Sequence, residues 1–218
     1  MKIKHIIWDW NGTLLNDNWL AIEAINILLE KYDLHTINQE KYLEIFTFPV
    51  IEYYKKLGFD FDQTPFSVVG TEFIEEYTKL MFKTDLQDGA LESLNYFHEN
   101  GISQSLLSAA KQKMLDDLMK FHKLEKYFIK ISGLTDHYAN SKVGAGKTWI
   151  KELNINAQAA LMIGDTLHDF EVADEIGTEC VLIAQGHTKY ERLKSSGKNV
   201  FHNLHEFMEW FKINEKIN

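Results

Sequence analysis

The sequence has little cysteine, a deficit of positive charge and no long hydrophobic run. Cys180 is the only cysteine, so it has no partner for an intramolecular disulfide, and in the apolar stretch CVLIA we expect a buried structural thiol. The formal net charge of −9 disfavours a broad attraction to nucleic acid or acidic lipid, since both require a positive surface. An anionic ligand would need local compensation from a metal ion, a few lysines or backbone N–H groups.

The lack of a long apolar run excludes membrane-spanning classes. Asp9 and Asn11 interrupt the apolar residues near the N-terminus, so no signal peptide is expected there, and no later stretch could span a bilayer. We therefore expect a cytoplasmic protein without membrane or nucleic-acid partners, and a monomer by default. Its 218 residues, 45% hydrophobic and 25% charged, suffice for one large domain or for a core domain that carries a smaller one.

The order of hydrophobic patterns predicts an α/β fold. An Ile-rich segment at 2–8 indicates a buried first strand, and from residue 18 the apolar spacing becomes helical. After Gly89 strands and helices alternate, which implies a Rossmann-like parallel sheet with helices on both faces and an all-helical insertion after the first strand. The predicted helices of the insertion are 38–46, 50–57 and 66–83; the later strands are 103–107, 128–132, 159–163 and 179–183, and the later helices 90–99, 111–122, 146–153, 167–176, 188–195 and 203–212.

Polar residues that directly follow the predicted strands are candidates for a functional site. In open parallel sheets, ligands bind outside the carboxyl ends of the strands. The candidates are Asp9 and Asn11 after the first strand, Ser108 after the second, and Asp165 and Asp169 after the strand ALMI.

Each candidate has both a chemical and a structural interpretation. Asp9, in DWNGT, could attack phosphorus or only shape a strand-to-helix turn. Asp165 and Asp169 are four residues apart, so both lie on one side of a helical turn, where they suit Mg²⁺ or cap the helix. Ser108 could donate its hydroxyl to a phosphoryl oxygen or cap the following helix. Lys142 could neutralise a carboxylate and a phosphate, with Lys147 as the competing candidate.

Together these motifs resemble the four signatures of the haloacid dehalogenase superfamily, in chain order. IIWDWNGTLL resembles the first motif, with Asp9 as nucleophile, and SLLSAA the second, with Ser108 as the phosphate-binding hydroxyl. GDTLHDFEVA resembles the fourth, with Asp165 and Asp169. For the third motif Lys142 fits, because it precedes Asp165 by 23 residues, a separation familiar in the superfamily.

The resemblance implies a fold and a chemistry. Residues 17–84, including FPVIEYYKKLGF, are similar to the helical cap of phosphoglycolate-phosphatase-like members, so residues 1–16 and 85–218 are expected to form the α/β core. It implies hydrolysis of a small phosphorylated metabolite through an aspartyl-phosphate. It also implies a set of ligands: Asp9, the backbone carbonyl of Asn11, Asp165 and Asp169 for Mg²⁺, and Thr13, Ser108 and Lys142 for the phosphoryl group.

Asn11 departs from the family pattern. Phosphatases of the superfamily usually carry a second Asp at this position, which protonates the leaving oxygen and later deprotonates the attacking water. An amide can do neither, and such a loss removes ~10²- to 10⁴-fold in rate. We therefore expect slow turnover, a preference for good leaving groups such as acyl or aryl phosphates, and a persistent aspartyl-phosphate.

Other interpretations remain open at this stage. DWNGT also resembles phosphonoacetaldehyde hydrolases, for which Lys55 and Lys56 are the available Schiff-base lysines, and this is a minority alternative. In a second minority alternative, Asn11 marks a degenerate site in a phosphate- or metal-binding interaction protein. SKVGAGKT lacks the first glycine of a phosphate-binding P-loop, and two histidines, His202 and His205, seldom make a metal site alone. Candidates for specificity in the helical insertion are Trp19, Phe48, Tyr53, Tyr54 and Lys56.

Overall fold

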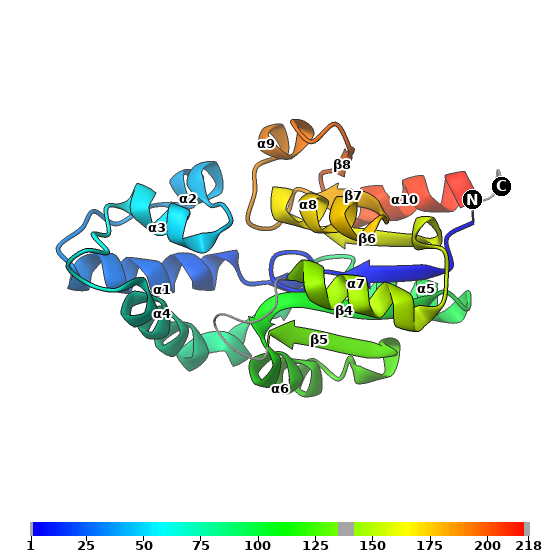
Figure 1. The fold of residues 1–218 in the computed structure, drawn as a ribbon, viewed down its shortest axis with the longest axis horizontal. Coiled ribbons are helices and arrows are strands. Elements are labelled where there is room, and N and C mark those ends of the chain that lie inside the picture. Colours follow the sequence, from blue (N-terminus) through cyan, green and yellow to red (C-terminus); the bar gives the residue numbers. More distant parts are fainter. Residues whose placement is uncertain (1, 135–141, 216–218) are drawn as a thin grey trace.

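A six-stranded parallel sheet forms the centre of the molecule (Figure 1). The computed structural model describes residues 2–134 and 142–215. The strand order is β5-β4-β1-β6-β7-β8, and every pairing is parallel. The predicted α/β fold is therefore confirmed, and the first strand lies in the middle of the sheet. The strands are β1 (His5–Trp8), β4 (Ser103–Lys111), β5 (Lys130–Leu134), β6 (Ala160–Gly164), β7 (Glu179–Ile183) and β8 (Asn199–Phe201).

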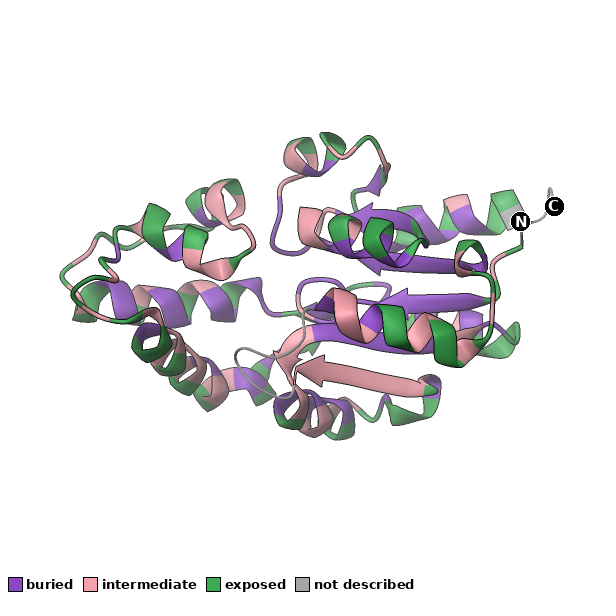
Figure 2. Cartoon of the chain, in the orientation of Figure 1, coloured by how far each residue is buried: buried purple, intermediate pink, exposed green. Residues whose placement is uncertain are grey.

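Helices cover both faces of the sheet, and its central strands β1 and β6 are buried along their whole length. Successive side chains of a strand point to opposite faces, so Ile6 and Trp8 pack with α5 (Ala90–Glu99), α6 (Gln112–His122) and α10 (Leu204–Glu215). Ile7 packs on the other face with α7 (Lys142–Leu153), α8 (Leu167–Ile176) and α9 (Tyr190–Lys194). Figure 2 shows the central strands buried between these two layers.

A helical segment, α1 to α4, lies beyond the carboxyl ends of the strands (Figure 1). It has a hydrophobic core of its own, which includes Ile25, Tyr54 and Val69. Two short antiparallel strands, β2 (Leu15–Asn16) and β3 (Asp85–Leu86), pair where the chain leaves for this segment and returns from it. The helices are α1 (Asn18–Lys31), α2 (Gln39–Ile45), α3 (Val50–Leu57) and α4 (Phe66–Leu80), followed by a 3₁₀ turn, Met81–Lys83.

Several boundaries differ from the predicted ones. β4 runs to Lys111 instead of 107, with a register shift after Leu107, so α6 begins at Gln112. α7 begins at Lys142 instead of 146, although the glycines in its first turns favoured a loop. Gly146 is instead packed closely, since an added Cβ would lie 3.0 Å from Ile176. The strands β2, β3 and β8, of two or three residues each, were not predicted.

Cys180 is buried in β7, as its apolar neighbours predicted. Burial raises the pKa of its thiol well above the ordinary value. Among the described residues, no helix has both the length and the apolar composition that crossing a bilayer requires.

Candidate active site

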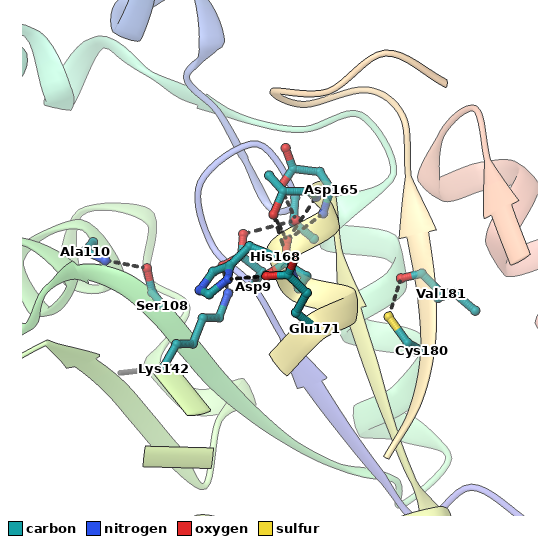
Figure 3. Close-up of polar contacts among 12 residues, drawn as sticks. Asp9, Ser108, Ala110, Lys142, Asp165, His168, Glu171, Cys180 and Val181 are labelled. Carbon is teal, nitrogen blue, oxygen red and sulfur yellow. Dashed lines mark hydrogen bonds and ion pairs between the residues drawn. The ribbon is translucent and has the colours of Figure 1, made fainter. Parts of the chain in front are cut away.

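The loop after β1 presents Asp9 at the carboxyl end of the central strand (Figure 3). Gly12 follows with φ +75°, a left-handed conformation that glycine adopts without cost. A Cβ at this position would collide with the Asp165 carboxylate and the His187 ring. Thr13 donates its hydroxyl to Asp165 Oδ1 at 3.0 Å and approaches Asp9 Oδ2 at 3.3 Å. The glycine turn therefore lets a threonine hydroxyl join two buried carboxylates.

The loop after β6 brings two more carboxylates to the same place. Asp165, at the end of β6, is fully buried, and Asp169 lies in the first turn of α8. Carboxylate oxygens of Asp9, Asp165 and Asp169 all lie within 4.8 Å of one another. Asp165 does not cap α8: the cap residue is Thr166, whose hydroxyl donates to Asp169 Oδ2 at 2.7 Å. Capping thus uses one oxygen of Asp169 and leaves its other oxygen facing the cluster.

Lys142, at the first residue of α7, points its ammonium group into this cluster (Figure 3). It forms ion pairs with Asp9 Oδ1 and with Asp169 Oδ1, the latter at 2.5 Å, and its side chain is 3% exposed. The competing candidate, Lys147, is half exposed and pairs with Glu175 at 2.7 Å. The spatial convergence of positions 9, 142 and 165 that the motifs require is therefore present.

The cluster carries more negative charge than its lysine balances. Burial, together with the neighbouring Asp169, raises the pKa of Asp9 to about 6 in spite of Lys142. Burial likewise raises the pKa of Asp165 to about 8, which His187 offsets only in part. Burial disfavours the Asp169 carboxylate too, but Lys142 and the hydrogen bonds from Thr166 hold its pKa below the usual value. The site therefore has a local excess of buried carboxylate that an added cation would stabilise.

Ser108 is buried near the irregular end of β4 (Figure 3). Its hydroxyl accepts a hydrogen bond from the backbone N–H of Ala110 at 3.0 Å. It does not cap α6, because the cap residue is Lys111. At this point the cavity wall is formed by Ala109, Ala110 and Lys111.

Asn11 is engaged in a hydrogen-bond network that the sequence did not indicate. Its amide donates to Asp17 Oδ2 at 2.8 Å and to the Tyr77 hydroxyl at 3.1 Å, and Tyr77 in turn donates to Asp17 Oδ2 at 2.7 Å. Asp17 Oδ1 accepts from the backbone of Gly12 at 2.8 Å. Burial would raise the pKa of Asp17, but the charge of His187 and these hydrogen bonds hold it below the ordinary value. A buried carboxylate, Asp17, therefore lies directly beside the amide of Asn11.

His187, in the loop after β7, is a further residue of the site that sequence analysis missed. Its backbone N–H donates to Asp165 Oδ2 at 2.6 Å, and its Nε2 lies 3.4 Å from Asp17 Oδ1. Its Nδ1 is 2.8 Å from the Tyr42 hydroxyl of α2. Burial lowers its pKa, but Asp17 and Asp165 outweigh burial and raise the pKa to about 9. Its position just after a strand was a signal that could have found it.

A cavity of about 550 Å³ extends from the carboxylates to the helical segment. Of the proposed specificity residues, Phe48, Tyr53 and Tyr54 line it. Trp19 is 37% exposed and Lys56 is exposed, and neither is among the described lining residues.

The alternative motifs do not form sites in the described part of the chain. Lys55 is exposed and pairs with Glu52 at 2.8 Å, outside the cavity. His202 stacks on Tyr190, and His205 pairs with Asp88 at 3.2 Å. The segment SKVGAGKT falls partly outside the described residues, and from Lys142 onward it is the helix α7.

Comparisons with known proteins identify the family and the fold of the chain. The family model described as haloacid dehalogenase-like hydrolase matches residues 6–183. A Listeria monocytogenes protein named pyrophosphatase PpaX is 26% identical over 186 residues, which are 81% of each chain. A haloacid dehalogenase-like family hydrolase from Streptococcus pneumoniae superposes with a TM-score of 0.83 at 18% identity, covering 96% of this chain and 98% of the other. CbbY from Rhodobacter sphaeroides, solved with phosphate, has a TM-score of 0.72 at 17% identity, covering 94% and 96%.

Proposed function

Because the chain belongs to the haloacid dehalogenase-like hydrolase family and is a phosphatase-type hydrolase, we propose that it hydrolyses small phosphate esters with Mg²⁺, through an aspartyl-phosphate on Asp9. In this proposal residues 1–16 and 85–218 form the catalytic core, and residues 17–84 form a cap over it. The observation that carries the proposal is the convergence of Asp9, Asp165 and Asp169 within 4.8 Å, with the Lys142 ammonium group between Asp9 and Asp169.

The residues present fit a divalent cation. Carboxylate oxygens are the hard ligands that Mg²⁺ prefers. Burial, and then the neighbouring carboxylates, raise the pKa values of Asp9 and Asp165, and a bound cation would favour their ionised forms. Asp9, Asp165 and the backbone carbonyl of Asn11 would hold the ion, with Asp169 as a further ligand. When bound, it supplies positive charge beside the phosphoryl oxygens.

The chain's own residues then divide the chemistry between them. A carboxylate oxygen of Asp9 attacks phosphorus, and the bond to the substrate's alcohol oxygen breaks; the alcohol leaves with a proton taken from solvent. Water next attacks the phosphorus of the aspartyl-phosphate, which releases phosphate, returns the Asp9 carboxylate and gives a proton to solvent. Lys142 neutralises Asp9 before attack and the phosphoryl group afterwards, while Thr13 and Ser108 donate hydroxyl hydrogen bonds to phosphoryl oxygens.

Asn11 sets the expected rate in this scheme. Its amide cannot exchange a proton with the leaving alcohol or with the attacking water, so both transfers use solvent. The absence of that help corresponds to about 10²- to 10⁴-fold in rate. Esters with good leaving groups, such as acyl and aryl phosphates, should therefore react fastest.

The test is a panel of phosphodonors, with and without Mg²⁺, that measures both phosphate release and covalent labelling of Asp9. We expect Mg²⁺-dependent release and an acid-stable label that mass spectrometry assigns to Asp9, both abolished in Asp9→Asn. The control is Glu175→Gln, which changes the exposed partner of Lys147 and should behave as the native protein. If no donor gave either phosphate or label, the chain would be a binding protein and the proposal would be wrong.

A further inference from the structure

The cavity has a charged half and an aromatic half. The charged half belongs to the α/β core and contains Asp9, Lys142, Asp165 and Asp169. The other half belongs to the helical segment, and most of its side chains are aromatic or aliphatic. The aromatic residues that define it are Phe46, Phe48, Tyr53, Tyr54, Phe66 and Phe73.

Among the described residues, the helical segment contributes no lysine, arginine or histidine to the cavity wall. The charged residue it does contribute is Asp17, a buried carboxylate. A second anionic group on a substrate, such as the carboxylate of phosphoglycolate or the second phosphoryl group of pyrophosphate, would find no positive partner in that half. Burying an unpaired charge is strongly unfavourable. This half of the cavity therefore selects against small substrates that carry a second anionic group besides the phosphoryl group.

Among the described residues, the lysines and histidines of the cavity wall all come from the core. His187 lies against Tyr42 and Phe46 of the helical segment, but its Nε2 is already paired with Asp17. Lys142 is paired with two carboxylates. His168 stacks against Phe48, with ring centroids 4.8 Å apart and an interplanar angle of 23°. Lys111, at the start of α6, also lines the cavity, so its contribution must be tested directly.

The size of the cavity also exceeds what a phosphoryl group needs. About 550 Å³ lies within the range of pockets that hold whole organic ligands. An aromatic group on the ligand would be buried against the aromatic rings of this half of the cavity. Burial of a phenyl-sized group favours binding by about 10- to 100-fold. Volume and chemistry thus point to the same kind of leaving group.

We propose that the substrate of this site is a phosphate monoester whose alcohol carries an aromatic or similarly bulky apolar group. The phosphoryl group lies on the carboxylate cluster, and the apolar group lies between Phe48 and α4. This inference rests on the proposed phosphatase function, and it adds the substrate class to it.

The first arm of the test compares 2-phenylethyl phosphate with phosphoglycolate. Both release a primary alcohol, so the comparison does not depend on an unusually good leaving group. We expect kcat/KM to be about 10- to 100-fold higher for the phenylethyl ester. Ser67→Lys adds a cation to the aromatic half without removing a packed side chain, because Ser67 is exposed and lines the cavity. It should lower or reverse the preference, whereas Val68→Lys, one residue along α4 and outside the cavity, should keep it.

The second arm measures binding and does not require turnover. Titration calorimetry with Mg²⁺ compares 3-phenylpropylphosphonate with 3-phosphonopropionate, the non-hydrolysable analogues of the two esters. Tighter binding of the phenyl compound supports the inference even if turnover is absent, in which case only the phosphatase proposal fails. Equal or tighter binding of 3-phosphonopropionate overturns the inference. If Lys111→Met then abolished that binding, Lys111 would be the residue that binds the second anionic group.

Discussion

Replacing Asn11 by Asp tests the expectation that the missing acid slows turnover, and the structure predicts that the gain in rate is accompanied by a loss of stability. The new carboxyl group would lie where an amide now donates to Asp17 Oδ2 at 2.8 Å. Two buried carboxylates at that separation cannot both be ionised, so one of them must hold a proton. A shared proton of this kind is what a general acid needs.

The size of both effects follows from the contacts. Asn11→Asp loses the amide that donates to the charged Asp17, an interaction that contributes about 1.5 to 3 kcal/mol. The proton that the two carboxyl groups share instead must be held at a pH where a free carboxyl group has lost it, so we expect the free energy of unfolding to fall by about 2 to 3 kcal/mol. For a chain of this length that corresponds to a loss of roughly 4 to 12 °C in Tm. Phosphate release in Mg²⁺ should rise by about 10²-fold or more.

The assays are urea unfolding without Mg²⁺ and steady-state phosphate release with Mg²⁺. A double variant, Asn11→Asp with Asp17→Asn, again pairs one carboxylate with one amide, so it should recover most of the lost stability. If Asn11→Asp were as stable as the native protein, the described pairing with Asp17 would be wrong. If stability fell without any gain in rate, the proposed role of position 11 would be refuted.

Three further perturbations test other parts of the structure. Lys142→Met leaves buried carboxylates unpaired and should cost about 3 to 5 kcal/mol in urea unfolding without metal; Lys147→Met, at an exposed pair, should change it by less than about 1 kcal/mol. Burial lowers the pKa of His5 to about 4 from 6.5, so between these pH values the unfolded chain binds a proton that the folded chain does not. The free energy of unfolding should therefore fall by about 3 kcal/mol from pH 6.5 to pH 4, and His5→Gln should lack this part of the pH dependence. Arg192 donates to the carbonyls of Leu43 at 2.9 Å and Phe46 at 2.8 Å, so Arg192→Ala should free the end of α2 and raise KM several-fold with little change in kcat; an unchanged KM would show that this contact does not shape the cavity.

The sequence predicted most of what depends on strand ends and on spacing along the chain. The pattern of β1 placed Asp9 at a strand end, and the separation of 23 residues favoured Lys142 over Lys147; the structure shows Lys142 paired with Asp9 and Lys147 with Glu175. The catalytic and metal-binding roles of these residues remain predictions.

What the sequence did not predict depends on contacts between distant loops. Asp17 and His187 are 170 residues apart in the chain, and nothing near either residue indicates that Asp17 approaches the side chain of Asn11. Ser108 was expected to follow the second strand, but it lies inside β4, because the strand continues beyond a register shift after Leu107. Short strands such as β8 have too few residues to show an alternating pattern.

The central position of β1 has a consequence for how the chain acquires its shape. β1 ends at Trp8, whereas the strands that pair with it begin at Ser103 and Ala160, so during synthesis it waits for the whole helical segment and α5 before it has a sheet neighbour. Pairings over such long stretches of chain are slow to form, and an unpaired apolar strand is prone to aggregate meanwhile. Production of this protein should therefore benefit from a chaperone that shields β1 until β4 has been made.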